Sequence, residues 1–417
     1  MAIFAQPIDP EEAAPLPLVE EERWRRWLGV FVMLSGGIIT TLALTCIGPG
    51  QPAIADHFKG HATIFGDDPI LNAQLVLSMA TLGMAAAGLF AGWIIARAGV
   101  RRTLFAAYGL AFLAGSCQLW VDSLPVLYTA RFVLGCSVVS ADVALTTILG
   151  ARYAGSSRTW LIGFRQAIAS AGTVSTFLLS GFLIQNYGWR APAWMFVLPL
   201  LFALLSVAAF NRPLERADRK PEARALERFS ALDLWPIYVL CLVMAIAHTM
   251  PSSQMPFLLK EDGVTDANLI SRVSALSAFI GIITAVCFGF IYRRAGRLTF
   301  VLASFCMGAG FIGVGFAPGY NFILACIVVE GIGAGMTQPY FASRILDRIT
   351  AAQRGQALGF MLSTVFIGLF MNPFVIKPLR DQLGIHMAFV VVGGFLVAAA
   401  LALGLRAATT RGKNTIV

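Results

Sequence analysis

Five ionisable side chains interrupt the long apolar stretches of this 417-residue chain, and they are Arg131, Asp142, Arg165, His248 and Glu330. A charge at the centre of a bilayer costs at least about 2.5–3.5 kcal/mol, so such a group normally faces a cavity or a partner. A carboxylate or imidazole in that position can take up and release a proton, and an arginine can hold an anion. The pattern predicts solute or proton binding. It shows no convergence of acid, base and nucleophile, so we do not expect an enzyme.

Arg131 and Asp142 lie 11 residues apart in one apolar block. At 100° per residue this spacing puts both on one face of a helix, together with Gly135 and Val138. Charged residues on such a face normally meet a cavity or a partner. Two roles stay open for Arg131, which either holds an anionic group of a substrate or clamps neighbouring backbone carbonyls near the outer end.

Asp142 and Arg165 flank a predicted hairpin turn near residue 155, at 13 residues before it and 10 after it. Their depths therefore differ by about 4.5 Å, which a long arginine side chain can reach. Because leaving either charge alone would be costly, we predict an ion pair. It either gates a conformational change or ties two helices together.

Glu330 lies in the middle of its apolar block, with Ala334 and Thr337 on the same helical face. A lone carboxylate there could serve as a reversible proton site, or it could be hydrogen-bonded across a helix interface. His248 precedes Pro251 and is either a functional group or a hydrogen-bonded packing residue. Uncharged polar residues complete the expected cavity lining: Thr40, Thr41, Thr45, Gln338 and Asn372. Threonine hydroxyls often bond back to their own helix.

The elements that position these residues must be membrane-spanning helices. Hydrophobic residues make up 58% of the chain and charged residues 13%, against roughly 25% charged in typical globular proteins. The apolar blocks are about 20 residues long, as a bilayer core of roughly 30 Å requires of a helix, and show none of the alternation of a β-barrel. We predict twelve spans, at residues 27–48, 73–95, 103–121, 125–150, 160–184, 190–210, 233–257, 268–291, 298–317, 320–343, 355–377 and 384–405. The polar stretch before the first span is not a cleaved signal peptide.

The distribution of basic residues predicts the orientation. With both termini in the cytoplasm, cytoplasmic segments hold 23 of the 31 basic residues and outside segments hold six, as the positive-inside rule requires. The net charge of +9 is therefore a topology signal and does not indicate nucleic acid binding.

The seven cysteines all fall within predicted spans, without metal-ligand spacing, so we expect neither disulfides nor a metal, and no cofactor. Arginine outnumbers lysine 26 to 5 and alanine is abundant. This composition favours a high-GC bacterium and hence its inner membrane.

An internal repeat divides the chain. Gly135 recurs as Gly331 and Gly188 as Gly384, both 196 residues later. Further matches at offsets of 196 or 197 are Arg158 with Arg354, Gly163 with Gly359, Gly172 with Gly368, Gly92 with Gly289, Arg97 with Arg294, and Gly99 with Gly296. We predict two similar six-helix bundles at 27–210 and 233–405, a cytoplasmic linker at 211–232, and cytoplasmic tails at 1–26 and 406–417.

The stretch from Gly92 to Arg102, with Arg97, Gly99 and Arg101, resembles the loop signature of the major facilitator superfamily after its second helix. Gly289, Arg294 and Gly296 form the degenerate second copy. Arg131-Phe-Val-Leu-Gly135 resembles the fourth-helix pattern of the family, and Gly188-Trp-Arg190 stands where its sixth helix often opens. The resemblance covers the chain apart from tail and linker. It implies a twelve-helix, all-α membrane protein in which helices one, four, seven and ten surround a central cavity.

Two departures from the family pattern stand out. Ala96 replaces the acidic residue of the loop signature, and Arg293 stands at the matching place in the second half. The resemblance implies a cytoplasmic latch that is weaker or built otherwise. In the fifth helix only Gly181 survives of the Gly-Pro pattern of proton-driven exporters, which disfavours a drug exporter.

These patterns predict a secondary active transporter of a small polar or amphipathic organic solute, working by alternating access and coupled to protons through Glu330 or Asp142. Its expected partners are the solute, protons and membrane lipid, which would hold the basic turn at 97–102, and we expect a monomer. Two alternatives stay open, namely a proton-driven exporter of drugs or siderophore-like metabolites and a non-transporting membrane sensor. Neither the solute nor the direction of transport follows from the sequence.

Overall fold

The protein was analysed as a computed structural model, which describes residues 23–153, 155–210, 230–296, 298–350 and 353–413. The described residues are almost entirely helical, with one isolated bridge between Thr63 and Gly66. Most of the N-terminal tail and of the central linker predicted from the sequence lie outside these residues. α16 continues to Lys413, beyond the predicted end of the last span at residue 405.

The helices of the first half are α1 (Arg23–Ser35), α2 (Gly37–Thr45), η1 (Gly48–Gly50), α3 (Gln51–His57), α4 (Pro69–Ala98), α5 (Val100–Ser116), η2 (Cys117–Leu119), α6 (Leu124–Arg152), α7 (Gly155–Tyr187), η3 (Ala191–Phe196) and α8 (Val197–Ala209). Those of the second half are η4 (Ala231–Leu234), α9 (Trp235–His248), α10 (Met250–Ser253), α11 (Met255–Glu261), α12 (Ala267–Ala295), α13 (Leu298–Gly315), α14 (Tyr320–Leu346), α15 (Arg354–Leu383) and α16 (Ile385–Lys413).

Eleven helical segments in the described part of the chain are long and apolar enough to cross a membrane. The remaining predicted span is α5, which has 17 residues and continues into η2. α5 packs against α6 and α8, as a full member of the first bundle would. The prediction of an all-α membrane protein is confirmed, and most helices extend several residues beyond the ends expected from hydropathy.

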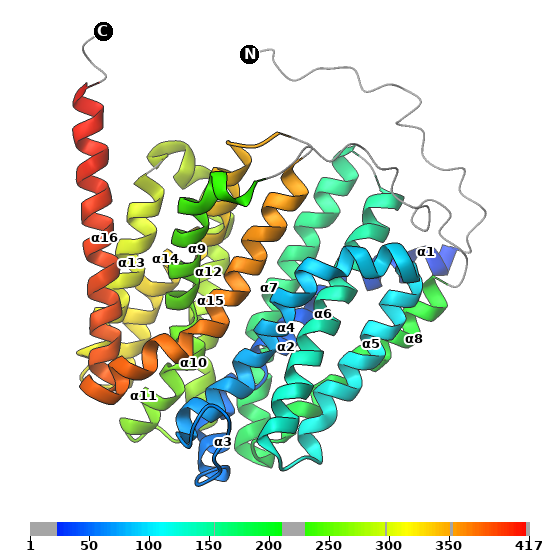
Figure 1. The fold of residues 1–417 in the computed structure, drawn as a ribbon, viewed down its shortest axis with the longest axis horizontal. Helices are drawn as coiled ribbons and strands as arrows, with labels where there is room; N and C mark the ends of the chain where they lie inside the picture. The colour runs from blue at the N-terminus through cyan, green and yellow to red at the C-terminus, as the bar shows by residue number, and fades with distance from the viewer. Residues whose placement is uncertain (1–22, 154, 211–229, 297, 351–352, 414–417) are drawn as a thin grey trace.

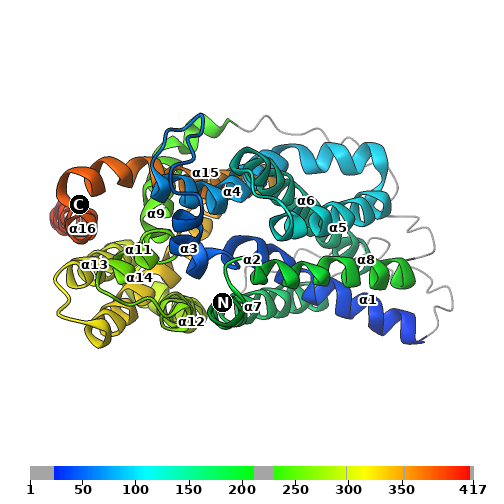
Figure 2. The same ribbon diagram turned by 90° about the horizontal axis from the view of Figure 1, so that it is seen from below.

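The two halves lie side by side in Figure 2, with α1–α8 in one group and α9–α16 in the other. They meet along two seams, where α4 packs against α15 and α7 against α12. In Figure 1, α3 and α11 lie together at one end of the molecule, and the last turns of α16 lie at the other. We call the first the aspartate end, after Asp56, Asp68 and Asp122. The other is the arginine-rich end.

The repeat found in the sequence is also a repeat of packing. A Cβ on Gly135 would lie 1.9 Å from the carbonyl oxygen of Ala80, and one on Gly331 would lie 3.0 Å from that of Ser277. Glycine therefore lets α6 approach α4 and lets α14 approach α12 at equivalent places. The paired positions Gly99 and Gly296 both have positive φ, at 83° and 53°. Glycine adopts this backbone conformation at little cost.

The loop signature lies at the arginine-rich end. The Arg97 guanidinium stacks 4.2 Å from the Trp93 ring, and Arg294 stacks 4.3 Å from Phe290. Arg97, Arg102 and Arg294 are exposed, as are Gly92 and Gly289, whereas Arg101 is half-buried. The gating role of these residues stays a prediction.

Candidate functional site

The first helix of each half is broken near the aspartate end. α9 ends at His248, and the chain continues as two short helices, α10 and α11, with Pro251 and Pro256 near their starts. In the first half, η1 and α3 likewise carry Pro49 and Pro52. Proline has no N–H to donate to the carbonyl four residues earlier, so each break frees backbone oxygens inside the membrane.

Side-chain amides donate hydrogen bonds to the carbonyl oxygens that the breaks leave free. Pro256 cannot bond to the Ser252 carbonyl, and Gln51 Nε2 donates to that oxygen at 2.7 Å instead. Phe257 N–H bonds to the Gln254 carbonyl, and Gln74 Nε2 donates to the Ser253 carbonyl at 3.1 Å. The prolines in the sequence cause the helix breaks. The fold then places amide side chains where they bond to the freed carbonyl oxygens.

Gln74, Gln254 and Asn372 form a chain of side-chain hydrogen bonds, and Gln51 binds the Ser252 carbonyl beside it. We call these four amide residues the amide network. Gln74 Nε2 donates to Gln254 Oε1 at 2.8 Å, and Gln254 Nε2 donates to Asn372 Oδ1 at 3.0 Å. Asn372 Nδ2 in turn donates to the Ile246 carbonyl at 2.8 Å, near the end of α9. All four side chains are at most 1% exposed. The network therefore ties α3 and α4 to the broken seventh span and to α15.

Three polar atoms at this place have no hydrogen-bond partner among the described residues, and they are Gln51 Oε1, Gln74 Oε1 and Ser253 Oγ. Leaving a buried polar atom unpaired costs about 1–3 kcal/mol. Buried groups of this kind are rare in native proteins, and each needs an explanation.

Ion pairs join the two halves at the same end. Lys260 of α11 contacts Asp56 of α3 at 2.6 Å. Asp68, which precedes α4, pairs with Arg380 and, at 2.9 Å, with Lys377 of α15. Burial alone would raise the pKa of Asp68, but the hydrogen bond from Lys377 and the positive charge of Arg380 outweigh it and hold that pKa below its ordinary value.

The predicted pair between Asp142 and Arg165 forms. Arg165 donates through one terminal nitrogen to Asp142 Oδ1 and through the other to Thr146 Oγ1 at 2.6 Å. The Arg165 side chain is 11% exposed and that of Asp142 is 38% exposed. The pair links α6 to α7, so its geometry is confirmed, while its role in gating remains a prediction.

Arg131 is buried inside the first half, whereas we expected its side chain to line a cavity. It is 2% exposed. Its Nη2 donates to Gln118 Oε1 at 2.6 Å, and its guanidinium lies 5.7 Å from the Phe196 ring. Gln118 Nε2 donates onward to the Trp189 carbonyl at 2.8 Å. α6 presents Arg131 and Asp142 on one face, but a long side chain can turn toward η2 and η3. This placement favours the clamp over the substrate contact.

Glu330 is fully buried within the second half, so it does not face the central space as expected. Its Oε2 accepts a hydrogen bond from Ser277 Oγ of α12 at 2.7 Å. Its Oε1 has no partner among the described residues. A Cβ on Gly310 of α13 would lie 2.8 Å from the Glu330 Cβ. The carboxyl group thus lies between α12, α13 and α14, near one hydroxyl.

The remaining predicted lining residues have different surroundings. Thr41 is half-buried and donates to the Ile38 carbonyl at 2.9 Å, as a packing threonine does. Asn372 belongs to the amide network. His248 is exposed.

Gln51, Gln74 and Gln254 were not predicted. The available signal was a glutamine beside proline in the first span of each half, in Gly48-Pro49-Gly50-Gln51-Pro52 and in Pro251-Ser-Ser-Gln254-Met-Pro256.

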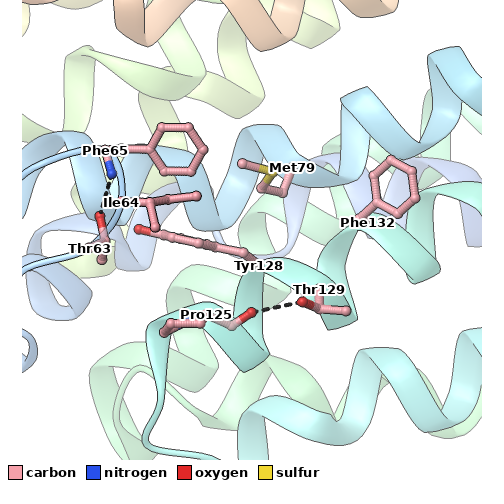
Figure 3. Close-up of a pocket in the computed structure, with 8 residues that line it drawn as sticks. All are labelled: Thr63, Ile64, Phe65, Met79, Pro125, Tyr128, Thr129 and Phe132. Carbon is pink, nitrogen blue, oxygen red and sulfur yellow. Dashed lines mark hydrogen bonds between the residues drawn. The ribbon is translucent and has the colours of Figure 1, made fainter.

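A separate pocket of about 320 Å³ lies at the flank of the first half (Figure 3). Ile64, Phe65, Tyr128 and Met79 gather on one side of it, while Phe132 stands further along α6. Tyr128 Oη lies 3.1 Å from Asn72 Oδ1. This mostly apolar pocket has no contact with the amide network, so it is not the candidate site.

Two groups of six spans, joined at one end by ion pairs and buried amides, define a multi-pass membrane protein built from two similar halves. The family model of the Major Facilitator Superfamily matches residues 33–373, and the chain belongs to this family. The resemblance seen in the loop signature is therefore confirmed. The chain is a secondary transporter and not an enzyme.

Three known proteins illustrate the likeness. The cis,cis-muconate transport protein of Acinetobacter baylyi is 25% identical over 353 residues, which are 78% of this chain and 82% of that protein. The arabinose-proton symporter of Escherichia coli is 28% identical over 217 residues, which are 51% of this chain and 43% of that protein. The crystal structure of a D-xylose-proton symporter superposes with a TM-score of 0.71 at 16% identity, over 90% of this chain and 96% of that one.

Proposed function

We propose that this protein moves a small polar organic solute across the inner membrane by alternating access, with protons as the coupling ion. The main support is an asymmetry in where the two halves contact each other. Hydrogen bonds and ion pairs between the halves gather at the aspartate end, in the amide network and at Asp56 and Asp68. Asp142 and His248 lie within the predicted spans, and both are exposed, the Asp142 side chain to 38%. Because a charged or polar side chain is costly toward lipid, we take these two to face an internal cavity.

This asymmetry fits one state of a two-state transporter, closed at the aspartate end and open toward the arginine-rich end. By the positive-inside rule, the arginine-rich end faces the cytoplasm. The state is then inward-facing, and the last turns of α16 lie on the cytoplasmic side.

Two acidic groups are candidates for the coupling proton. Glu330 is buried next to Ser277 and lacks a cationic partner within the described residues. Because an isolated carboxylate is costly inside a membrane, this group is stable there with its proton bound. Asp142 differs, because Arg165 stabilises it as an anion. We therefore place the coupling proton on Glu330, with Asp142 as the second candidate.

According to their names, one relative of this chain transports cis,cis-muconate and another transports arabinose together with protons. Uptake of radiolabelled cis,cis-muconate and L-arabinose into proteoliposomes tests the function. We expect one of them to accumulate when the interior is made alkaline, and a protonophore to abolish that accumulation. Accumulation that persists with the protonophore present would remove protons from the mechanism.

A further inference from the structure

The hydrogen bonds that Gln51 and Gln74 make to α10 share one polarity. Gln51 and Gln74 belong to the first half and donate, whereas the Ser252 and Ser253 carbonyls belong to the second half and accept. Two carbonyls surround the Gln51 amide nitrogen, from Ser252 at 2.7 Å and from Gly48 at 3.3 Å. A carbonyl oxygen turned toward those acceptors would be repelled, which fixes the orientation of the amide.

Opening of this end must break these inter-half bonds. The surfaces that separate then expose a set of mostly accepting atoms. These are the two released carbonyls, Gln254 Oε1, and the oxygens of Gln51 and Gln74, which are already unpaired in this state. The donors that the first half contributes are the amide groups of Gln51 and Gln74. A ligand that satisfies such a surface must bring several donors of its own.

We infer that the amide network is the binding site of a neutral, polyhydroxylated solute such as a sugar or cyclitol. This inference rests on the proposed function and narrows its substrate class. A hydroxyl group both donates and accepts, so solute hydroxyls replace the inter-half bonds between Gln51 or Gln74 and the α10 carbonyls. A site that hydrogen-bonds a substrate hydroxyl rejects analogues without it, because its own buried groups are then left unpaired.

The same atoms disfavour a dicarboxylate such as muconate. An ionised carboxylate only accepts, and it would face the carbonyl oxygens of Ser252 and Ser253. Arg131 and Arg165, which lie deep in the spans, are engaged elsewhere, Arg131 with Gln118 and Arg165 with Asp142. The side chains of the amide network carry no charge that would balance two carboxylates.

Counterflow exchange in proteoliposomes tests this assignment without any proton gradient. Proteoliposomes that contain the full chain are loaded with unlabelled L-arabinose, myo-inositol or cis,cis-muconate. Entry of the same solute in labelled form is then followed. We expect exchange of at least one polyol and none of muconate. Gln74→Leu should lower the polyol exchange at least about tenfold, since it removes a donor and an acceptor.

Gln74→Glu and Gln51→Glu provide a second test if the leucine variant folds poorly. Both keep the shape of the side chain but replace the amide donor, so polyol exchange should also fall. Asn186→Ala, an exposed amide at the end of α7, is the matched control and should exchange normally.

Exchange of muconate without any polyol, or of none of the three solutes, would overturn the inference. So would polyol exchange that is unchanged in well-folded Gln74→Leu. The failure of this inference can be told apart from the failure of the proposed function. Uptake of muconate driven by a pH gradient would support the transporter function but would rule out a polyhydroxylated substrate.

Discussion

Asp68 joins the two halves while it also begins a helix. Its Oδ1 accepts from the Ile70 N–H at 3.0 Å as the N-cap of α4, and its Oδ2 pairs with Arg380 of α15. One side chain thus fixes the start of the second span and holds the opposite half against it. Because asparagine caps helices about as well as aspartate, the two roles can be separated by mutation.

Asp68→Asn should open the aspartate end without unfolding α4. The variant keeps a capping oxygen but loses the attraction to Lys377 and Arg380, about 1–2 kcal/mol for partly exposed pairs. This corresponds to a population shift of about five- to thirtyfold. Spin labels at Lys59 and Glu261, with the exposed Cys287 replaced by serine, should report a longer distance in electron resonance. Asp67→Asn is the adjacent control. An unchanged distance distribution in Asp68→Asn would show that this carboxylate does not hold the end closed.

The same spin-label pair should be insensitive to pH between 5 and 8. The pKa of Asp68 is lowered in the closed state, so its contribution is fully present above the ordinary value of 3.8 and is lost as the pH falls below it. We expect the closed population to decrease only under those acidic conditions. A transition near pH 6 would assign the control of closure to a group other than Asp68.

The ion pair between Asp142 and Arg165 should show coupling in a double-mutant cycle. Asp142→Asn and Arg165→Gln each leave one charge without its partner, whereas the double variant leaves no unpaired charge. Because Asp142 is 38% exposed, we expect a coupling of about 1–2 kcal/mol in the free energy of unfolding, below the 3–5 kcal/mol lost when a fully buried pair is broken. Thermal unfolding in detergent measures it. Strictly additive losses would indicate that the two side chains do not interact in the membrane.

Glu330→Gln should abolish the coupling of transport to protons but leave the exchange of solute intact. Glutamine keeps an oxygen for the Ser277 hydroxyl but cannot take up a proton, so pH-driven accumulation should disappear while counterflow exchange continues. Ser277→Ala is the companion variant, which removes the hydrogen bond to Oε2 but leaves the carboxyl group and should retain coupling. Normal pH-driven accumulation in Glu330→Gln would move the coupling proton to Asp142 or His248.

Arg131→Ala should lower stability more than it changes solute recognition. The substitution leaves Gln118 Oε1 buried without its donor, which costs about 1–3 kcal/mol. We expect a lower melting temperature and an unchanged half-saturating solute concentration in the folded fraction. Loss of solute binding in folded Arg131→Ala, with binding retained in Arg131→Lys, would instead favour the substrate contact.

The sequence by itself determined the helices, their repeat and the family. Apolar blocks of about 20 residues have one stable form in a bilayer, because each backbone polar group must be satisfied within its own segment. The repeated glycines marked where helices approach, as Gly135 and Gly331 do. The pairing of Asp142 with Arg165 was also predictable, because a hairpin fixes the relative depth of residues on its two arms.

Only the tertiary structure decided what each polar side chain faces. The spacing that placed Arg131 and Asp142 on one helical face could not reveal that the Arg131 side chain turns back to Gln118. Gln51, Gln74 and Gln254 lie far apart in the chain, and each alone is an unremarkable glutamine. They come together because the two halves meet where Pro256 leaves a carbonyl without its N–H. Periodicity describes one helix at a time, whereas such contacts depend on how separate helices pack.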